Sequence, residues 1–289
     1  MGRSMLADRA RRHAEPLAPL LERVTAVGLL PSAVVLAAQA FMALIPLLIA
    51  AVALAPAGVG QTIAGVARQR LGLSGDTGEQ VNHLVATRDD LRGTITVLGA
   101  LVILASATSF TRALQRIYET AWELPRLGLR GSLRGLGWLL GLVAYFALLG
   151  LALKLTTSPA VAASALRYIL VGLAAFVLWW LTPFILLCGR VRLRALIGTG
   201  LLTAVALVIA GAVSAAVMPS FIGSNERQYG TIGVAFAIES WLVVIASIIV
   251  GSTIIGAYAA QSDSALGRLA RGRDEPNGWR RPSRWDSRG

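Results

Sequence analysis

A single carboxylate lies within a long apolar stretch near the C-terminal end of the sequence. Glu239 is the only charged residue between Gly230 and Tyr258, in GTIGVAFAIESWLVVIASIIVGSTIIGAY. A charge at the centre of a hydrocarbon layer costs at least about 2.5 kcal/mol, so ionisable residues there usually face a wet or protein interior and have partners. If this stretch crosses a membrane, the chemistry open to Glu239 depends on those partners.

Two interpretations of Glu239 are open. In the first, a nearby cation keeps it ionised, and it lines an outward-facing polar cavity that receives a headgroup or couples to protons. The basic residues at the same ends of neighbouring apolar stretches are Lys154, Arg167 and Arg227. In the second, Glu239 makes a structural hydrogen bond to a Ser or Thr of a neighbouring helix. The same two alternatives apply to Gln39, a polar residue in the first apolar stretch.

Other residue sets that could carry out chemistry are missing from the sequence. His13 and His83 are the only histidines, one before the first apolar stretch and one after it. No GxxxxGK[ST] phosphate-binding motif is present, and the acidic residues between 76 and 90 lack the spacing of a calcium loop. Because neither a nucleophile with its base nor a set of metal ligands can be assembled, we expect a protein that is not an enzyme and has no metal site and no cofactor.

The composition indicates a membrane protein. Hydrophobic residues make up 55% of the 289 residues and charged residues only 15%, unlike a soluble globular domain. Six apolar stretches are long enough to cross roughly 30 Å of hydrocarbon as helices. They are 30–55, 94–110, 135–156, 168–187, 194–218 and 233–258. We therefore expect an all-α, polytopic fold with six transmembrane helices.

The positions of the basic residues predict the orientation. Of the 27 basic residues, 20 lie before the first apolar stretch, in the second and fourth loops or in the C-terminal tail. The positive-inside rule then places both termini in the cytoplasm. The net charge of +12 is explained by this topology and by attraction to anionic headgroups, about 1 kcal/mol for each basic residue near the surface. A nucleic-acid partner is not expected.

Three regions follow from this topology. The leader, residues 1–29, has apolar residues at helical spacing and predicts an interfacial amphipathic helix on the cytoplasmic face. The transmembrane domain covers 30–260, and its outer loop at 56–93 is expected to be helical. The tail, 261–289, mixes Arg, Pro, Gly and Trp and predicts a disordered basic cytoplasmic segment. Inside the first span, Pro46 removes a backbone hydrogen bond and predicts a kink.

The second apolar stretch continues as SFTRALQRIYETAW, which predicts a cytoplasmic extension of that helix beneath the bundle. Arg112, Arg116, Glu119 and Glu123 follow one another at spacings of three and four residues. Side chains at these spacings are neighbours on a helix surface. We therefore predict that the four residues pair along one exposed face.

Four stretches of the sequence, taken in order, resemble a known family. They are AAQAFMALIPLLIAAVAL at 37–54, SATSFTRALQRIYETAWELPR at 106–126, TPFILLCGRVRLRALIGTGLL at 182–202 and QYGTIGVAFAIESWLVVIASIIVGSTIIGAY at 228–258. Together they resemble the YihY/BrkB family of bacterial inner-membrane proteins. The likeness extends from about residue 20 to about residue 260.

The resemblance implies a six-helix inner-membrane protein with a role in envelope integrity, serum resistance or lipid and lipopolysaccharide traffic. Members of the family have carried an older label of ribonuclease. This sequence contains no set of residues that would form a nuclease site, so it does not support that label. The family's Phe and Pro of the first helix resemble Phe41 and Pro46, and its Tyr-Gly before the last helix resembles Tyr229 and Gly230. Glu239 stands where an apolar residue is expected in many members, so the resemblance assigns it no family-wide role.

We therefore expect a bacterial plasma-membrane protein that binds or translocates a lipid or another amphipathic envelope component. The alternative is a non-transporting scaffold whose arginine-rich inner face docks partners or anionic lipid in support of envelope integrity. An internal polar cavity would favour the first function, and a solidly apolar interior would favour the second. The expected partners are membrane lipids, with anionic headgroups at the cytoplasmic face, and the sequence is compatible with a homo-oligomer.

Overall fold

The computed structural model of the chain describes residues 18–54, 97–128 and 161–262, together with isolated helical positions between 134 and 145. Every assigned element in these ranges is an α-helix, as the sequence predicts. The predicted outer loop, Lys154, nearly all of the basic tail and most of the predicted third span lie outside the described residues.

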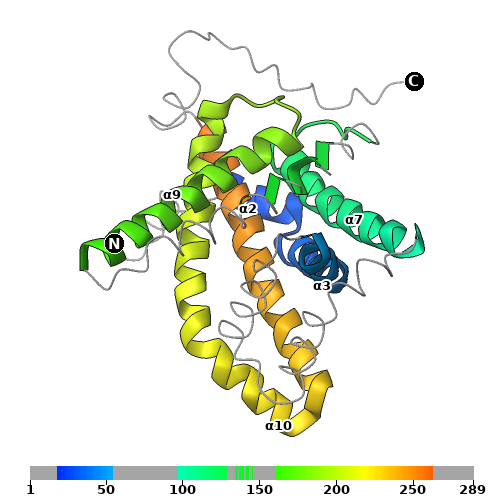
Figure 1. Cartoon of the computed structure of the whole chain (residues 1–289). Coiled ribbons are helices and arrows are strands. Elements are labelled where there is room, and N and C mark those ends of the chain that lie inside the picture. The colour runs from blue at the N-terminus through cyan, green and yellow to red at the C-terminus, as the bar shows by residue number, and fades with distance from the viewer. Residues whose placement is uncertain are drawn as a thin grey trace, which may run out of the picture.

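Five helices make up the described part of the chain (Figure 1). They are α2 (Ala18–Val27), α3 (Leu29–Leu54), α7 (Val97–Ala121), α9 (Val161–Leu186) and α10 (Leu193–Gln261). Three segments of them are long and apolar enough to cross a membrane, namely Glu22–Leu44, Ile169–Leu186 and Leu193–Gln261. The count of six spans stays a prediction. Pro46 lies inside α3, and the helix continues on both sides of it.

The helix α10 is a hairpin of two long arms. Figure 1 shows its first arm running away from the other helices and its second arm returning beside it. The backbone leaves the helical conformation at Gly230, where φ is 61° and ψ is −147°. Residues with a Cβ avoid this region of φ and ψ, so glycine is suited to the break. The two arms cover the predicted spans 194–218 and 233–258.

Apolar and small residues hold the two arms together. Near the bend, Met218 and Ile222 of the first arm are buried with Val234 and Ala237 of the second. At the opposite end, the arms approach so closely at Gly256 that a Cβ built there would lie 2.6 Å from the Cα of Thr199. Only glycine permits this approach, because a real Cβ needs more room.

The main core lies where the free ends of the α10 hairpin meet the other helices. It contains the largest fully buried side chains of α3, α7, α9 and α10, listed here in chain order: Leu36, Leu114, Tyr118, Trp122, Leu186, Leu187, Leu196 and Ile254. Isolated positions of the predicted third span join this core, since Trp138 is buried and donates a hydrogen bond from Nε1 to Thr182 Oγ1 at 3.0 Å. Both termini of α10 and the C-terminal end of α7 are thereby fixed relative to α3.

Away from this core, the hairpin exposes large apolar side chains along its length. On the first arm, Leu201, Val205, Ile209 and Val213 are each about half exposed. Contiguous apolar surface of this extent is rare on soluble monomers, and on a membrane helix it contacts lipid tails. The exposed apolar surface therefore agrees with the apolar sequence, and both identify an integral membrane protein.

Candidate functional site

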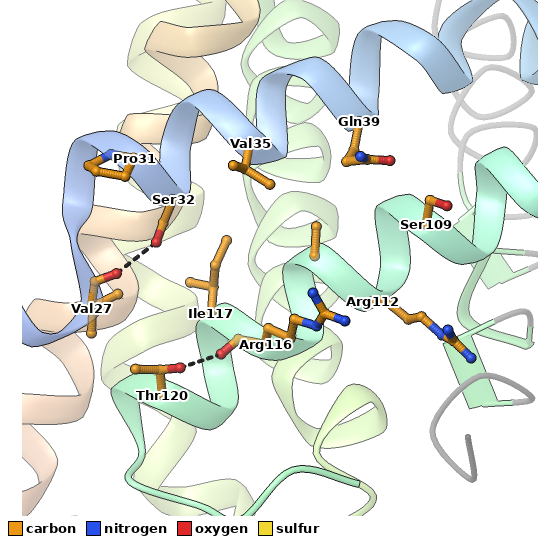
Figure 2. Close-up of a pocket in the computed structure, with 11 residues that line it drawn as sticks. Val27, Pro31, Ser32, Val35, Gln39, Ser109, Arg112, Arg116, Ile117 and Thr120 are labelled. Atoms are coloured by element: carbon orange, nitrogen blue, oxygen red, sulfur yellow. Dashed lines mark hydrogen bonds between the residues drawn. The ribbon is translucent and has the colours of Figure 1, made fainter. Parts of the chain in front are cut away.

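A pocket of about 420 Å³ lies between α3 and α7, next to the main core (Figure 2). One wall comes from the end of α2 and the beginning of α3, with Val27, Pro31, Ser32, Val35 and Gln39. The other wall comes from α7, with Ser109, Arg112, Ala113, Arg116, Ile117 and Thr120. Its volume falls within the roughly 300–1,000 Å³ of typical small-molecule sites.

Helical periodicity explains why these residues share a pocket. The α7 residues are spaced by one, three or four positions, and the α3 residues follow a similar pattern, so each set forms one face of its helix. The two helices run antiparallel along the pocket. Figure 2 shows Gln39 beside the Ser109 end of α7 and Val27 beside the Thr120 end. The pocket therefore follows the helix axes over about three turns.

The opposite face of α7 anchors that helix in the core. Leu114, Tyr118 and Trp122 are at most 2% exposed. Burial raises the pKa of the Tyr118 hydroxyl above its usual range, so Tyr118 stays neutral at physiological pH. This packing fixes the backbone of α7, from which Arg112 and Arg116 project on the other side.

The pocket combines two cations with an apolar wall. Among the described residues that line it there is no carboxylate, whereas Arg112 is half-buried and Arg116 is exposed at its edge. Each guanidinium carries five N–H donors in a planar fork that suits carboxylate and phosphate oxygens. The hydroxyls of Ser32 and Thr120 donate to the main-chain oxygens of Val27 and Arg116, at 2.7 and 2.9 Å. The arrangement is chemically suited to hold an anion.

Glu119 does not pair with the arginines of its own helix, so that part of the predicted exposed array is wrong. It is only 3% exposed, and its Oε1 accepts hydrogen bonds from Gln115 Nε2 at 2.9 Å, Leu127 N at 3.0 Å and Arg190 Nη2 at 2.9 Å. The physical reason is that the loop before α10 brings Arg190 to the buried side of α7. There it offers the desolvated carboxylate a charged partner.

Glu123 also turns away from Arg112 and Arg116. Its Oε1 lies 3.0 Å from Nη2 of Arg23 on α2. Arg23 donates in addition to Oε1 of Gln261 and lies over the ring of Tyr258 at 5.8 Å from its centroid. One arginine thus connects α2, the end of α7 and the end of α10. Both glutamates of this part of α7 are therefore engaged by arginines of other elements.

Among the residues that the sequence analysis singled out, Gln39 lies in this pocket. Glu239 lies on the second arm of α10, in the half nearer the bend at Gly230, and is partly buried; its Oε2 is buried with no hydrogen-bond partner among the described residues. Arg227 is exposed near the hairpin bend, and its Nη1 approaches Gly223 rather than Glu239. The backbone of Arg167 lies in α9, but its side chain is not described. The polar cavity predicted around Glu239 stays a prediction.

The residues that carry the family resemblance lie at defined positions in the fold. Phe41 lies on α3 two residues beyond Gln39 and is partly buried. Tyr229 and Gly230 form the bend of the α10 hairpin, where Tyr229 is 64% exposed. A turn between two long arms needs one residue with an unusual backbone conformation, and the Tyr-Gly pair supplies it. Within the described residues, no group of three or more His, Cys, Asp or Glu side chains is placed to hold a metal ion.

The sequence analysis missed Arg112 and Arg116 as pocket residues and Arg190 as a partner of Glu119. A signal was present for the first two, because the one-turn spacing of two arginines on the helix that continues past the membrane is visible in the sequence. No comparable signal exists for Arg190, which lies 71 positions from Glu119.

The described sites and the apolar helices can be set beside known proteins. No curated protein and no solved structure matches the chain. The family model described as virulence factor BrkB matches residues 20–276, a range that includes most of α2, all of α3, α7, α9 and α10, and the pocket between α3 and α7. This match confirms the resemblance drawn from the four sequence stretches. The chain belongs to the virulence factor BrkB family.

Proposed function

We propose that this protein resides in the bacterial plasma membrane and binds or translocates a lipid or another amphipathic envelope component, without catalysing a reaction. The observation that carries this proposal is the pocket between α3 and α7. It has arginines on the α7 wall and the amide of Gln39 on the α3 wall, and Val35 and Ile117 line the same space with apolar groups. A ligand with a polar head and an apolar body fits such a lining.

The predicted topology supports this function. With both termini in the cytoplasm, the first turns of α3 and the last turns of α7 lie at the cytoplasmic surface of the bilayer. Basic pockets between transmembrane helices on that side are suited to anionic lipid headgroups. A ligand could therefore reach the pocket from the inner leaflet without first leaving the membrane.

Transport in reconstituted vesicles tests the proposal. Purified protein would be inserted into vesicles that carry a trace of fluorescent lipid in one leaflet, and quenching from outside would report transfer between leaflets. Transfer that rises with the amount of protein, above that of vesicles holding an unrelated membrane protein, is the expected result. Binding of the labelled lipid, measured in parallel in detergent, separates a binding protein from a translocator. The absence of both binding and transfer for every amphipathic lipid class would refute the proposal.

A second function is favoured by a separate observation. The ion pairs Arg23–Glu123 and Arg190–Glu119 join the C-terminal end of α7 to α2 and to the loop between α9 and α10. Such cross-links between elements are suited to a static, non-transporting scaffold that supports envelope integrity. If labelled lipid binds at the pocket but does not cross the vesicle membrane, the scaffold function is favoured over translocation.

A further inference from the structure

The short helix α2 finishes at one end of the α3–α7 pocket, where Val27 is part of the lining. We infer that α2 is a hinged strap over this end of the pocket: it turns about Gly28, is latched by Arg23, and controls whether a ligand can enter beside Val27. The inference rests on the proposed function and deepens it, because it names how access to the same pocket is regulated.

Gly28, between α2 and α3, is the hinge. Its φ is 63°, a backbone conformation that residues with a Cβ rarely adopt. The nearest atoms to a Cβ built at Gly28 belong to the ring of Pro31, the closest at an ordinary contact distance of 3.8 Å. Glycine is therefore needed for the backbone angle and not for packing. Because glycine adopts positive and negative φ about equally well, the direction of α2 can change here at little cost.

The junction between the two helices also lacks one ordinary backbone hydrogen bond. In a continuous helix the carbonyl of Val27 would accept from the backbone nitrogen of residue 31, but Pro31 has no N–H. The hydroxyl of Ser32 donates to the Val27 oxygen instead, at 2.7 Å. A hydroxyl can rotate to follow a change in the angle between the helices, whereas a backbone N–H cannot. The junction is therefore built to bend.

The packing of α2 against the rest of the protein is light. Between Glu22 and Val27 no side chain is fully buried, and Val24 and Val27 are only partly buried against the main core. By contrast, α7 buries Leu114 and Tyr118 completely. Elements with few buried apolar contacts open locally at a lower free energy than the rest of a protein. Thus α2 can move away while α3 and α7 stay packed.

Arg23 is the latch that holds α2 in the closed position. Its Nη2 donates to Glu123 Oε1 at 3.0 Å and to Gln261 Oε1, and its guanidinium lies over the ring of Tyr258. Its other terminal nitrogen, Nη1, is buried with no hydrogen-bond partner among the described residues. A buried donor without an acceptor offsets part of what the other contacts gain. The ion pair itself adds little, because the Glu123 side chain is 61% exposed. The closed and open positions of α2 are therefore close in free energy.

Movement of α2 would change the pocket at a defined place. Figure 2 shows Val27 and Ile117 near the same end of the pocket as Thr120. Although Ile117 lines the pocket, it is only 5% exposed. When α2 turns about Gly28, Val27 leaves this end and the side chain of Ile117 becomes accessible. A ligand can then enter along the axes of α3 and α7.

The first experiment measures opening without any ligand. Ile117→Cys is introduced into the full-length protein in a Cys188→Ala background, and its reaction with N-ethylmaleimide in detergent is followed by intact-protein mass spectrometry. Arg23→Gln should speed labelling by about fivefold to tenfold, the effect of losing a charged hydrogen-bonding group. Glu123→Gln removes only the exposed partner and should speed labelling by about twofold to threefold.

Matched controls separate movement of α2 from general effects. Arg126→Gln removes the same charge from an exposed position on the loop after α7 and should leave the labelling rate of Ile117→Cys unchanged. A cysteine at Thr120, which is already exposed, should react at the same rate in every variant. If Arg23→Gln lowers the melting temperature of the whole protein, Glu123→Gln carries the test, because it leaves Arg23 on Tyr258 and Gln261.

The second experiment locks the strap. Arg23→Cys and Glu123→Cys, again in the Cys188→Ala background, are joined by a short bis-thiosulfonate linker that a reductant cleaves. Binding of fluorescent phosphatidylglycerol to the protein in detergent should be slowed about fivefold or more by the linker and restored by the reductant, as expected when a closed element gates a site.

The outcomes distinguish the strap from the proposed function. Equal labelling of Ile117→Cys with and without the Arg23 and Glu123 changes overturns the inference, and so does equal lipid binding by locked and unlocked protein. Faster labelling in the two latch variants, together with no lipid binding in either state, supports the strap and refutes the proposed function instead.

Discussion

The carboxylate of Glu119 lies 2.9 Å from the guanidinium of Arg190, which follows it 71 positions later in the chain. Arg190 also donates from Nη1 to the main-chain oxygen of Pro125 at 2.6 Å and from Nε to that of Leu187 at 3.1 Å. The guanidinium thereby fastens the C-terminal end of α7 to the loop between α9 and α10. Since α7 carries one wall of the pocket, this contact also helps to position the backbone of that wall.

Replacing Glu119 with Ala should lower the stability of the protein by about 2–3 kcal/mol, because the partly buried Arg190 guanidinium would lose its anionic partner and the Leu127 amide its acceptor. Glu123→Ala removes the same charge from a side chain that is 61% exposed and should cost no more than about 1 kcal/mol. Thermal unfolding in detergent, followed by circular dichroism, measures both. Equal melting temperatures for the two variants would contradict the assignment of Glu119 to a buried network.

Replacing Arg23 is expected to loosen α2 locally rather than to destabilise the whole protein. Its contacts with Glu123, Gln261 and Tyr258 are the polar contacts described between α2 and the ends of α7 and α10. Arg23→Gln should therefore speed amide hydrogen exchange in α2 by about tenfold, while exchange in the α10 core stays unchanged. Arg126→Gln, an exposed change on the loop after α7, is the control. Unchanged exchange in α2 would show that the apolar contacts of α2 alone hold it in place.

The close packing of the two α10 arms can be tested by replacing glycines with alanine. Gly256→Ala places a methyl group against the backbone of Thr199 and should destabilise the protein by about 1–3 kcal/mol. Gly211→Ala is the matched control, since a Cβ there has no atom within 4 Å among the described residues; it should be neutral or slightly stabilising because alanine favours the helix. The melting temperatures of the two variants measure this difference in stability. A stable Gly256→Ala protein would mean that the arms are not held in contact at this end.

The orientation predicted from the basic residues can be measured with single cysteines. In a Cys188→Ala background, Tyr229→Cys lies at the exposed bend of the hairpin and Arg126→Cys at the exposed loop after α7. A membrane-impermeant maleimide should label Tyr229→Cys on spheroplasts, because the bend is predicted to lie outside. Arg126→Cys should be labelled only after the membrane is permeabilised. The reverse pattern would place the pocket on the outer surface and contradict the inner-leaflet source of its ligand.

Part of the candidate site was readable in the sequence. Gln39 stands out in the sequence as a polar residue in an apolar helix, and it lies in the pocket. The family resemblance points to Tyr229 and Gly230, and Gly230 is the break in α10. Glu239 is also a polar residue in an apolar helix, yet it lies on the hairpin and is not among the residues that line the α3–α7 pocket. An isolated polar residue shows that something polar must be near it, but not what, because its neighbours come from other helices.

The spacing rule failed at Glu119 and Glu123 for a related reason. Residues three and four apart on a helix are within reach of each other, but exposed pairs of this kind gain only a few tenths of a kcal/mol. Partners from other elements gave Glu119 three hydrogen bonds in a buried setting. The stronger interactions decided where the carboxylates point.

By itself, the sequence determined the helical, membrane-embedded character of this protein and its family, because long apolar stretches and ordered local motifs are properties of neighbouring residues. The tertiary structure alone decided which charges are paired. Arg23 meets Glu123 across 100 positions and Arg190 meets Glu119 across 71, and such contacts depend on how the helices pack. Because that packing draws both glutamates to arginines of other elements, the pairing along one face of α7 that the local spacing predicts does not form.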